Sequence, residues 1–238
     1  MVRLAQRLRA RPTQGRPVRS RAALGTAGLL LLLFALMLLL VQDRWSPLAE
    51  VDAGAGDVLH RFAAAHPWFV RSMLTVSLLG SGWVWWGAAL VALLQMLRCR
   101  RRSTALFLAA TGLGSLALNR IVKALVHRAR PVVAHPVDRV GGFSFPSGHA
   151  QSAVVGYTIV LLLLLPPLAG GWRLLAVAMA VLMVLAIGFS RIALGVHFVS
   201  DVLAGYALGG AWGLVMAAAF DVRPVATARL RPAEGSPR

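Results

Sequence analysis

Long runs of apolar residues, separated by short polar segments, dominate the pattern along this chain. A helix that crosses a bilayer needs about 20 consecutive apolar residues, and six stretches of roughly that kind can be separated here. They cover residues 23–41, 73–97, 104–122, 150–165, 172–189 and 199–220. The pattern therefore predicts an all-α fold, a polytopic membrane helix bundle with six transmembrane helices.

Composition supports a single membrane domain. Hydrophobic residues make up 58% of the 238 residues, charged residues 14%, and the mean hydropathy is +0.71. Such a chain is too apolar to be a water-soluble domain. We expect a membrane domain over residues 23–220 between two basic cytoplasmic tails, 1–22 and 221–238. The apolar part of a cleavable signal peptide has about 7–15 residues. The first apolar run is longer, so it is interpreted as a membrane anchor that is not cleaved.

The net charge of +17 does not indicate nucleic-acid binding, because most basic residues flank apolar runs. Anionic membrane lipids are the expected partner of such residues. Lys and Arg accumulate on the cytoplasmic side, and placing both termini there puts 16 of the 25 basic residues inside and nine outside. We therefore expect a protein of the bacterial plasma membrane with both termini cytoplasmic. The oligomeric state stays open.

Polar chemistry gathers on the outer side in this orientation. All six histidines fall there, as does Asp201, the one acid inside a predicted span. An acidic residue within the membrane is a functional candidate by default. Basic residues kept on the outer side, mainly within 120–139, suggest anion binding. The single cysteine, Cys99, excludes an intrachain disulfide and a zinc site built on cysteines.

The first candidate stretch leads from Lys123 to Pro131, where the third span ends. Arg130 carries a planar fork that can bind two oxygens of one phosphate, whereas Lys123 carries a compact charge. Lys123 is the only lysine beside 24 arginines, which suggests that a point charge is needed there. Pro131 stops the helix. The stretch is suited to holding a phosphate.

Two further stretches complete the candidate site. Ser147, Gly148 and His149 stand where the fourth span begins, so Ser147 can cap the helix and Gly148 lets backbone N–H groups approach an anion. His197 and Asp201 are four residues apart and would share one face of a helix. The carboxylate could then hold one ring nitrogen while the other attacks substrate.

Each pattern also has an ordinary structural explanation. Basic residues at membrane edges usually extend to lipid headgroups, a Ser-Gly pair is often a plain helix cap, and a His–Asp pair is often structural. The occurrence of three such stretches on one side favours a functional site. The other histidines are interpreted as loop or interfacial residues: His127 and His135, and His60 and His66.

Together the stretches form Lys-X6-Arg-Pro, Pro-Ser-Gly-His and Ser-Arg-X5-His-X3-Asp, in that order. This set resembles the type 2 phosphatidic-acid phosphatase superfamily, membrane lipid phosphatases related in site architecture to vanadium haloperoxidases. The resemblance implies that His197 attacks phosphorus, Asp201 orients His197, and His149 protonates the leaving oxygen. It also implies that the phosphoryl oxygens are bound by Lys123, Arg130, Ser147, Gly148 and Arg191.

The implied activity is hydrolysis of a lipid phosphate or diphosphate at the outer membrane face. Phosphoryl transfer needs mostly positioning and charge stabilisation, which three cations and a helix N-terminus can supply, so we expect no metal and no other cofactor. Phosphatidic acid, phosphatidylglycerol phosphate, isoprenyl diphosphate and lipid A remain open as substrates. A phosphotransferase with the same intermediate is an alternative. An anion or lipid transporter would explain the charges but not the His197–Asp201 pair beside His149.

Two weaker patterns concern the surroundings of the site. Residues 45–71 mix apolar and charged residues as an interfacial segment does, and we expect them to line the route by which lipid reaches the site. In the last span Gly205, Gly209 and Gly213 recur every four residues. Such stripes of small residues let membrane helices pack closely.

Overall fold

The computed structural model describes residues 16–132, 141–164, 168 and 170–220. Within these residues all regular secondary structure is α-helical. In chain order the helices are α2 (Arg16–Gln42), α3 (Ser46–Ala65), α4 (Pro67–Leu79), α5 (Gly82–Arg98), α6 (Arg102–Val126), α7 (Gly148–Leu164), α8 (Gly171–Ala193) and α9 (Val199–Ala219).

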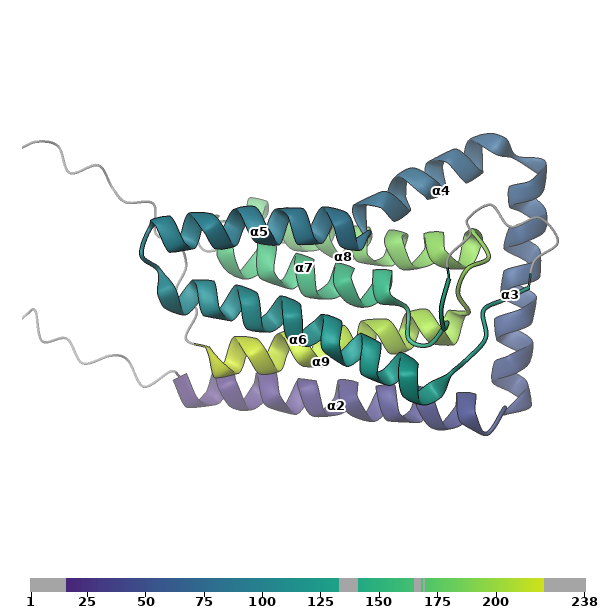
Figure 1. Ribbon diagram of the computed structural model, residues 1–238, viewed down its shortest axis with the longest axis horizontal. Coiled ribbons are helices and arrows are strands. Elements are labelled where there is room, and N and C mark those ends of the chain that lie inside the picture. Colours follow the sequence, from purple (N-terminus) through teal and green to yellow (C-terminus); the bar gives the residue numbers. More distant parts are fainter. Residues whose placement is uncertain (1–15, 133–140, 165–167, 169, 221–238) are drawn as a thin grey trace, which may run out of the picture.

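Most of these helices run along one common direction and form a bundle (Figure 1). By length and hydropathy, five segments of the described chain can cross a bilayer: α2, the pair α4–α5, α6, α8 and α9. Helix α7, with 17 residues, is shorter but equally apolar and lies between them. The predicted all-α membrane bundle is confirmed, with α7 as the sixth helix.

The second predicted span is not one straight helix. It begins at Pro67 and is broken between α4 and α5, where α4 turns away from the bundle (Figure 1). Gly80 ends α4, and Ser81 starts α5 by accepting a hydrogen bond from the backbone N–H of Val84 at 3.4 Å. A Cβ on Gly80 would clash with the side chain of Ile187, so a larger residue there would displace α4 from α8.

Other helix boundaries also differ from the sequence prediction. Helix α2 begins at Arg16 and so includes part of the segment predicted as a tail. Helix α6 continues to Val126, which places Lys123 in its last turn rather than beyond its end. Residues 1–15, 133–140 and 221–238 lie outside the described residues, and with them most of both predicted tails, His135 and Arg139.

Helix α9 forms the centre of the bundle. Half of its most apolar window is buried, against 11% for α2. The glycine stripe faces α7: a Cβ on Gly205 would lie 2.6 Å from the carbonyl oxygen of Ser147, and one on Gly209 would lie 2.8 Å from that of Gln151. At these two positions a side chain would push the helices apart, which confirms the expected close packing.

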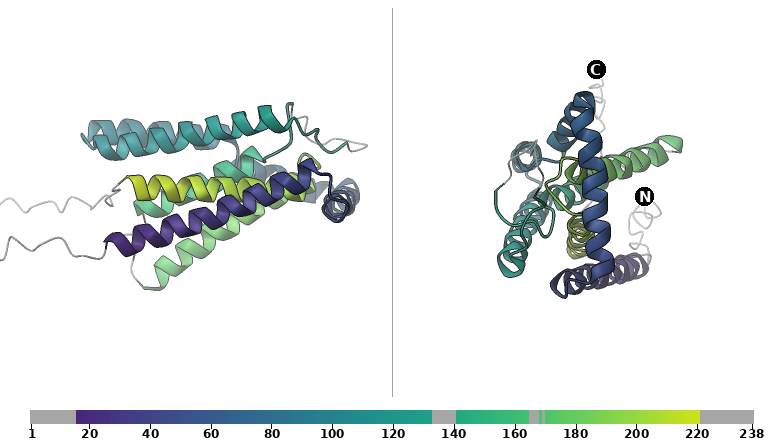
Figure 2. Two further views of the ribbon diagram at one scale, coloured as in Figure 1. Left: turned by 90° about the horizontal axis from the view of Figure 1, so that it is seen from below. Right: turned by 90° about the vertical axis from the view of Figure 1, so that its right-hand side faces the viewer.

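Helix α3 is the exception to the common direction, because it lies across one end of the bundle (Figures 1 and 2). It contacts α8 and α9 there. Asp52 and Ala63 are the buried residues of this helix, and most of its other side chains are exposed or partly exposed. Part of the segment expected to be interfacial therefore covers an end of the bundle.

Candidate active site

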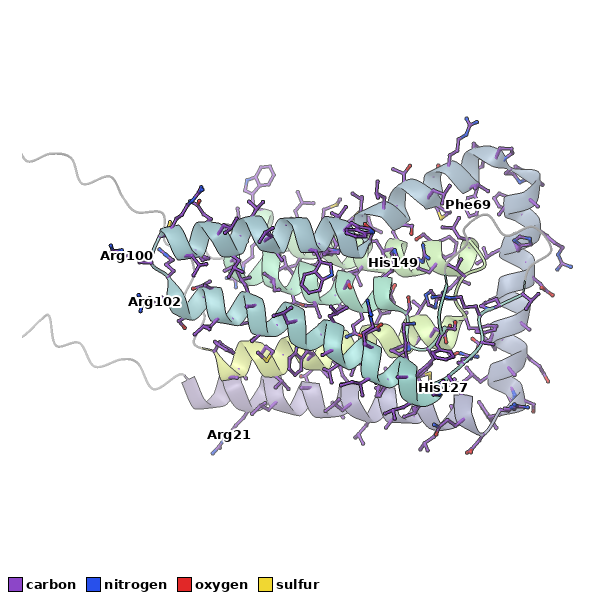
Figure 3. All side chains as sticks on the ribbon, in the orientation of Figure 1. Arg21, Phe69, Arg100, Arg102, His127 and His149 are labelled. Atoms are coloured by element: carbon purple, nitrogen blue, oxygen red, sulfur yellow. The ribbon has the colours of Figure 1, made fainter. Side chains whose placement is uncertain are left out.

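The three motif stretches meet near the end of the bundle that α3 covers. His127 and His149 lie toward this end, whereas Arg21, Arg100 and Arg102 lie at the opposite one (Figure 3). The stretches come from the end of α6, the start of α7 and the connection between α8 and α9. Because these are helix ends rather than helix middles, backbone N–H and C=O groups are available in the site beside the side chains.

His197 and Asp201 form the expected pair, but not on one helical face. His197 precedes α9, whose N-cap is Phe198. The Nδ1 atom of His197 lies 3.3 Å from Oδ2 of Asp201, and the same oxygen accepts the backbone N–H of Phe198 at 2.9 Å. The carboxylate thus caps the helix and holds the imidazole. The four-residue spacing works through this cap, which corrects the expectation of a shared helical face.

Arg130 approaches the other nitrogen of the imidazole. Its Nη1 donates to Nε2 of His197 at 3.2 Å and to the carbonyl oxygen of Val196 at 2.8 Å, while its Nε donates to the carbonyl oxygen of Gly142 at 3.0 Å. A guanidinium can only donate, so Nε2 accepts and carries a lone pair. The ring proton then lies on Nδ1, facing Asp201, which is the tautomer that a nucleophilic histidine requires.

The surroundings of His197 also keep its ring neutral. Burial lowers the pKa of His197 from its usual 6.5 to about 4. The charges of Arg130 and Lys123 lower this pKa further, whereas the hydrogen bond and charge of Asp201 oppose the change. At neutral pH the imidazole is therefore unprotonated and able to attack an electrophile.

Lys123 and Ser147 hold the segment that leads into α7. The Nζ of Lys123 donates to the carbonyl oxygens of Phe143, at 2.6 Å, and Ser144, at 3.2 Å. The Oγ of Ser147 accepts the N–H of Ala150 at 3.4 Å, which confirms the predicted helix cap. The N–H of Ser147 donates to the carbonyl oxygen of Asp201 at 2.9 Å. The start of α7 is thereby joined to α9.

His149 and Arg191 complete the set. His149 lies in the first turn of α7, next to Gly148, and its ring is within electrostatic reach of four predicted site residues: Arg191, His197, Arg130 and Lys123. Arg191, 1% exposed, lies in the last turn of α8 and donates a hydrogen bond to Ser77 of α4. All eight candidate residues named from the sequence thus lie in the same region of the bundle, which combines two histidines, one carboxylate and three cations.

The structure adds three polar residues that the sequence analysis did not select. The hydroxyl of Ser144 donates to Oδ2 of Asp201. Arg128 donates to Oδ1 of Asp201 at 2.6 Å and to Oδ2 of Asp52, on α3, at 2.8 Å. Ser144 and Arg128 lie inside or beside the motif stretches and could have been suspected from that position. Nothing in the sequence around Asp52 connects it to the site.

A cavity of about 700 Å³ opens beside the site. It extends along α7 from His149 to Leu163 and along α6 from Arg120 to Leu108, with α5 as the third wall. Its lining is mostly apolar and includes Trp83, Trp85, Trp86, Gly112 and Val155. Residues 45–71 do not contribute to this lining, so the cavity lies elsewhere than the lipid route expected from the sequence.

Residues 103–224, more than half of the chain, match the PAP2 superfamily, and they include all three motifs. The chain belongs to this superfamily. The family resemblance that the motifs indicated is thereby confirmed.

Two curated relatives are phosphatases by name. Phosphatidylglycerophosphatase B of Bacillus subtilis is 41% identical over 95 residues, which are 39% of this chain and 46% of the relative. Decaprenylphosphoryl-5-phosphoribose phosphatase of Mycobacterium tuberculosis is 33% identical over 120 residues, which are 49% of this chain and 62% of the relative. The matches thus span about half the length of these proteins.

Two crystal structures resemble most of this chain. A transmembrane PAP2-type phosphatidylglycerolphosphate phosphatase from Bacillus subtilis has a TM-score of 0.72 and 25% identity, covering 80% of this chain and 94% of its own. LpxE from Aquifex aeolicus has a TM-score of 0.53 and 24% identity, covering 69% and 93%. The latter is a likeness of fold alone.

Proposed function

We propose that this protein is a membrane phosphatase that hydrolyses a lipid phosphate or diphosphate through a phosphohistidine intermediate on His197. The observation that carries the proposal is the state of the imidazole: Nδ1 faces Asp201, and Nε2 carries a lone pair directed toward the cationic side of the site. This arrangement suits attack on an anionic phosphorus. Membership of the superfamily and the names of the relatives support the same activity.

The reaction would proceed in two steps. Nε2 of His197 bonds to phosphorus while the bond from phosphorus to the lipid oxygen breaks, and His149 gives that oxygen a proton. Water then attacks the phosphohistidine, His149 takes a proton from the water, and inorganic phosphate leaves as the bond between phosphorus and nitrogen breaks. Charge on the phosphoryl oxygens would be stabilised by Lys123, Arg130, Arg191 and the backbone N–H groups at Ser147 and Gly148.

A lipid substrate is supported by the cavity beside the site. The cavity begins at His149, the proposed proton donor to the leaving oxygen, and continues between apolar walls toward Leu163. The leaving group of a lipid phosphate is the part that carries the hydrocarbon chains. A phosphate held at His197 would therefore place these chains where apolar side chains can contact them.

We further propose that the site faces the outside of a bacterial plasma membrane and that both termini are cytoplasmic. Arg21, Arg100 and Arg102 lie at the bundle end opposite to His149 (Figure 3), as the accumulation of basic residues in cytoplasmic loops predicts. Exposed Cys99 lies at the same end and can report on it. A thiol reagent that cannot cross membranes should label Cys99 only after cells are opened. Labelling in intact cells would reverse the orientation.

The activity is tested by measuring phosphate release from a panel of lipid phosphates with purified protein in mixed micelles, with EDTA present. Phosphatidic acid, phosphatidylglycerol phosphate, an isoprenyl diphosphate, lipid A and decaprenylphosphoryl-5-phosphoribose belong in the panel, beside short-chain soluble esters. We expect efficient turnover of at least one long-chain lipid. Greater efficiency on soluble esters than on every lipid would defeat the lipid substrate. Transfer of labelled phosphate to another lipid would indicate a phosphotransferase, and binding without turnover a transporter.

A further inference from the structure

A carboxylate lies on the face of α3 that packs against the bundle. Asp52 and Ala63 are each 2% exposed, and Leu59, on the same side of the helix, packs with Ile192 and Val202. Burying an ionised carboxylate is strongly unfavourable unless it is paired and hydrogen-bonded. An apolar residue would attach α3 to the bundle without this cost. The presence of Asp52 therefore suggests a role other than helix packing.

The partners of Asp52 are Arg128 and Ser200, which contact or adjoin the catalytic carboxylate. Its Oδ1 accepts the backbone N–H of Ser200 at 2.9 Å, and its Oδ2 accepts the hydroxyl of Ser200 and Nη2 of Arg128 at 2.8 Å. Ser200 directly precedes Asp201. Both oxygens of Asp52 are thus used, and all of these contacts lie next to Asp201.

Arg128 stands between the two carboxylates. Its Nη2 binds Asp52, while its Nη1 donates to Oδ1 of Asp201 at 2.6 Å and to the hydroxyl of Ser200 at 2.7 Å. Its guanidinium carbon lies 4.1 Å from the centre of the Phe198 ring, a cation–π contact. The guanidinium is therefore fixed by two acids, one hydroxyl and one aromatic ring.

This arrangement helps to direct Oδ2 of Asp201 toward His197. Arg128 uses only one of its terminal nitrogens on Asp201 and binds Oδ1, so Oδ2 stays available to the imidazole as well as to the Ser144 hydroxyl and the Phe198 N–H. An arginine beside a single carboxylate prefers to bind both oxygens with two parallel hydrogen bonds. That geometry would draw Oδ2 away from Nδ1 of His197. Asp52 prevents it by holding the second nitrogen.

We infer that Asp52 is a positioning residue for the catalytic pair, acting through Arg128. The inference rests on the proposed function, since it assigns to α3 a part in the same reaction. Groups that orient metal ligands by hydrogen bonding contribute about 10–100-fold to activity, and we expect an effect of similar size from a group that orients a catalytic carboxylate. The contribution should appear in kcat rather than KM, because neither Asp52 nor Arg128 is assigned a contact with substrate in the proposed reaction.

The test compares Asp52→Asn with Asp57→Asn, which removes an exposed acid from the same helix. Steady-state kinetics of both purified variants are measured on the lipid phosphate that wild-type protein turns over best. We expect Asp52→Asn to lower kcat about 10–100-fold with KM unchanged, and Asp57→Asn to match wild type. Equal kcat in the two variants, or a loss confined to KM, would overturn the inference.

A double-mutant cycle shows whether the effect passes through Arg128. In an Arg128→Gln background, Asp52→Asn should lower kcat no further; an undiminished loss would contradict the inference. If Asp52→Asn does not fold, Arg128→Lys replaces it, since a single ammonium cannot divide its donors between two carboxylates in the same way. Arg128→Lys should lower kcat with KM unchanged, and wild-type kcat would overturn the inference. Wild-type protein that hydrolyses no lipid phosphate would instead defeat the proposed function.

Discussion

The surroundings of His197 and the cavity that begins at His149 differ in how firmly they fix what they contain. Around His197, the carboxylate of Asp201 is engaged by an imidazole, a guanidinium, a hydroxyl and a backbone N–H. The cavity between α5, α6 and α7 instead has mostly apolar walls, which make few directional contacts. We infer that the proposed reaction depends on the angles and distances around His197. Binding of the lipid's hydrocarbon chains would instead depend on the volume of the cavity. Changes in the two regions should therefore have different signatures.

After the loss of His197 itself, the largest effect is expected in His149→Ala, because His149 lies where the surroundings of His197 meet the cavity. Removing a general acid should slow turnover of long-chain lipid phosphates about 10²–10⁴-fold. Aryl phosphates, whose leaving groups need no proton, should be affected much less. Rates on both substrate types are compared with those of His66→Ala, a histidine between α3 and α4 outside the site. Equal losses on both substrates would contradict the role of His149.

The surroundings of His197 should also be sensitive to small changes in the spacing of α7 and α9. In Gly209→Ala the new Cβ would meet the carbonyl oxygen of Gln151 at 2.8 Å, and the backbone of α7 must move. Overpacking of this kind costs about 1–3 kcal/mol and should displace the start of α7. Both melting temperature and activity should fall.

Gly213→Ala is the matched control, because its Cβ would meet the side chain of Thr158 at 3.4 Å, close to ordinary contact. Thermal unfolding in detergent and initial rates are measured for the two variants together. If the two variants have the same melting temperature and the same initial rate, the close contact of α7 and α9 at Gly209 is not needed to position the site.

A change in the cavity should alter kcat/KM by an amount that depends on the chain length of the substrate. In Gly112→Leu the side chain enters the cavity, since a Cβ there meets only the Trp86 ring at 3.8 Å. Losing contact with two methylene groups of the lipid would cost about 1.6 kcal/mol, or roughly 10-fold in kcat/KM for long chains. Short-chain substrates should be unaffected.

Gly87→Leu provides the comparison, because Gly87 is exposed on α5 and outside the cavity lining. Values of kcat/KM are determined over a series of chain lengths for both variants. If Gly112→Leu lowers kcat/KM equally for all chain lengths, the cavity does not bind the hydrocarbon chains of the lipid.

A smaller effect concerns acid stability. The pKa of His197 is lowered to about 4 in the folded protein, from 6.5, so between these values the unfolded chain binds a proton that the folded site does not. Folding stability must therefore fall as pH falls through this range. Between pH 7 and pH 5 the melting temperature of wild type should decrease by more than that of His197→Gln. Parallel decreases would show that the neutral ring is not maintained by the fold.

The bundle and the motif residues could be predicted from the sequence because both are local in the chain. A membrane helix shows itself by its own apolar length, and each motif stretch is short. The break at Gly80 was not predicted, because it depends on contact with Ile187 of another helix. The sequence prediction puts His197 and Asp201 on one helix, whereas α9 begins at Val199 and the carboxylate of Asp201 caps its start.

The role of Asp52 could not be predicted from the sequence. Its partners Arg128 and Ser200 are 76 and 148 residues away along the chain, and no spacing rule connects such positions. An acid in an interfacial segment has the same pattern whether it faces water or an arginine. The cavity likewise depends on how α5, α6 and α7 pack, so its position could not be derived from residues 45–71.

The central claim is that His197 carries the phosphoryl group, and trapping that group tests it most directly. Purified protein is mixed with radiolabelled lipid phosphate, quenched within milliseconds in base and analysed for label on the protein. Wild type and His66→Ala should carry a label that is stable in base and released by acid, and His197→Ala should carry none and turn over no substrate. Full labelling and normal turnover in His197→Ala would contradict the account.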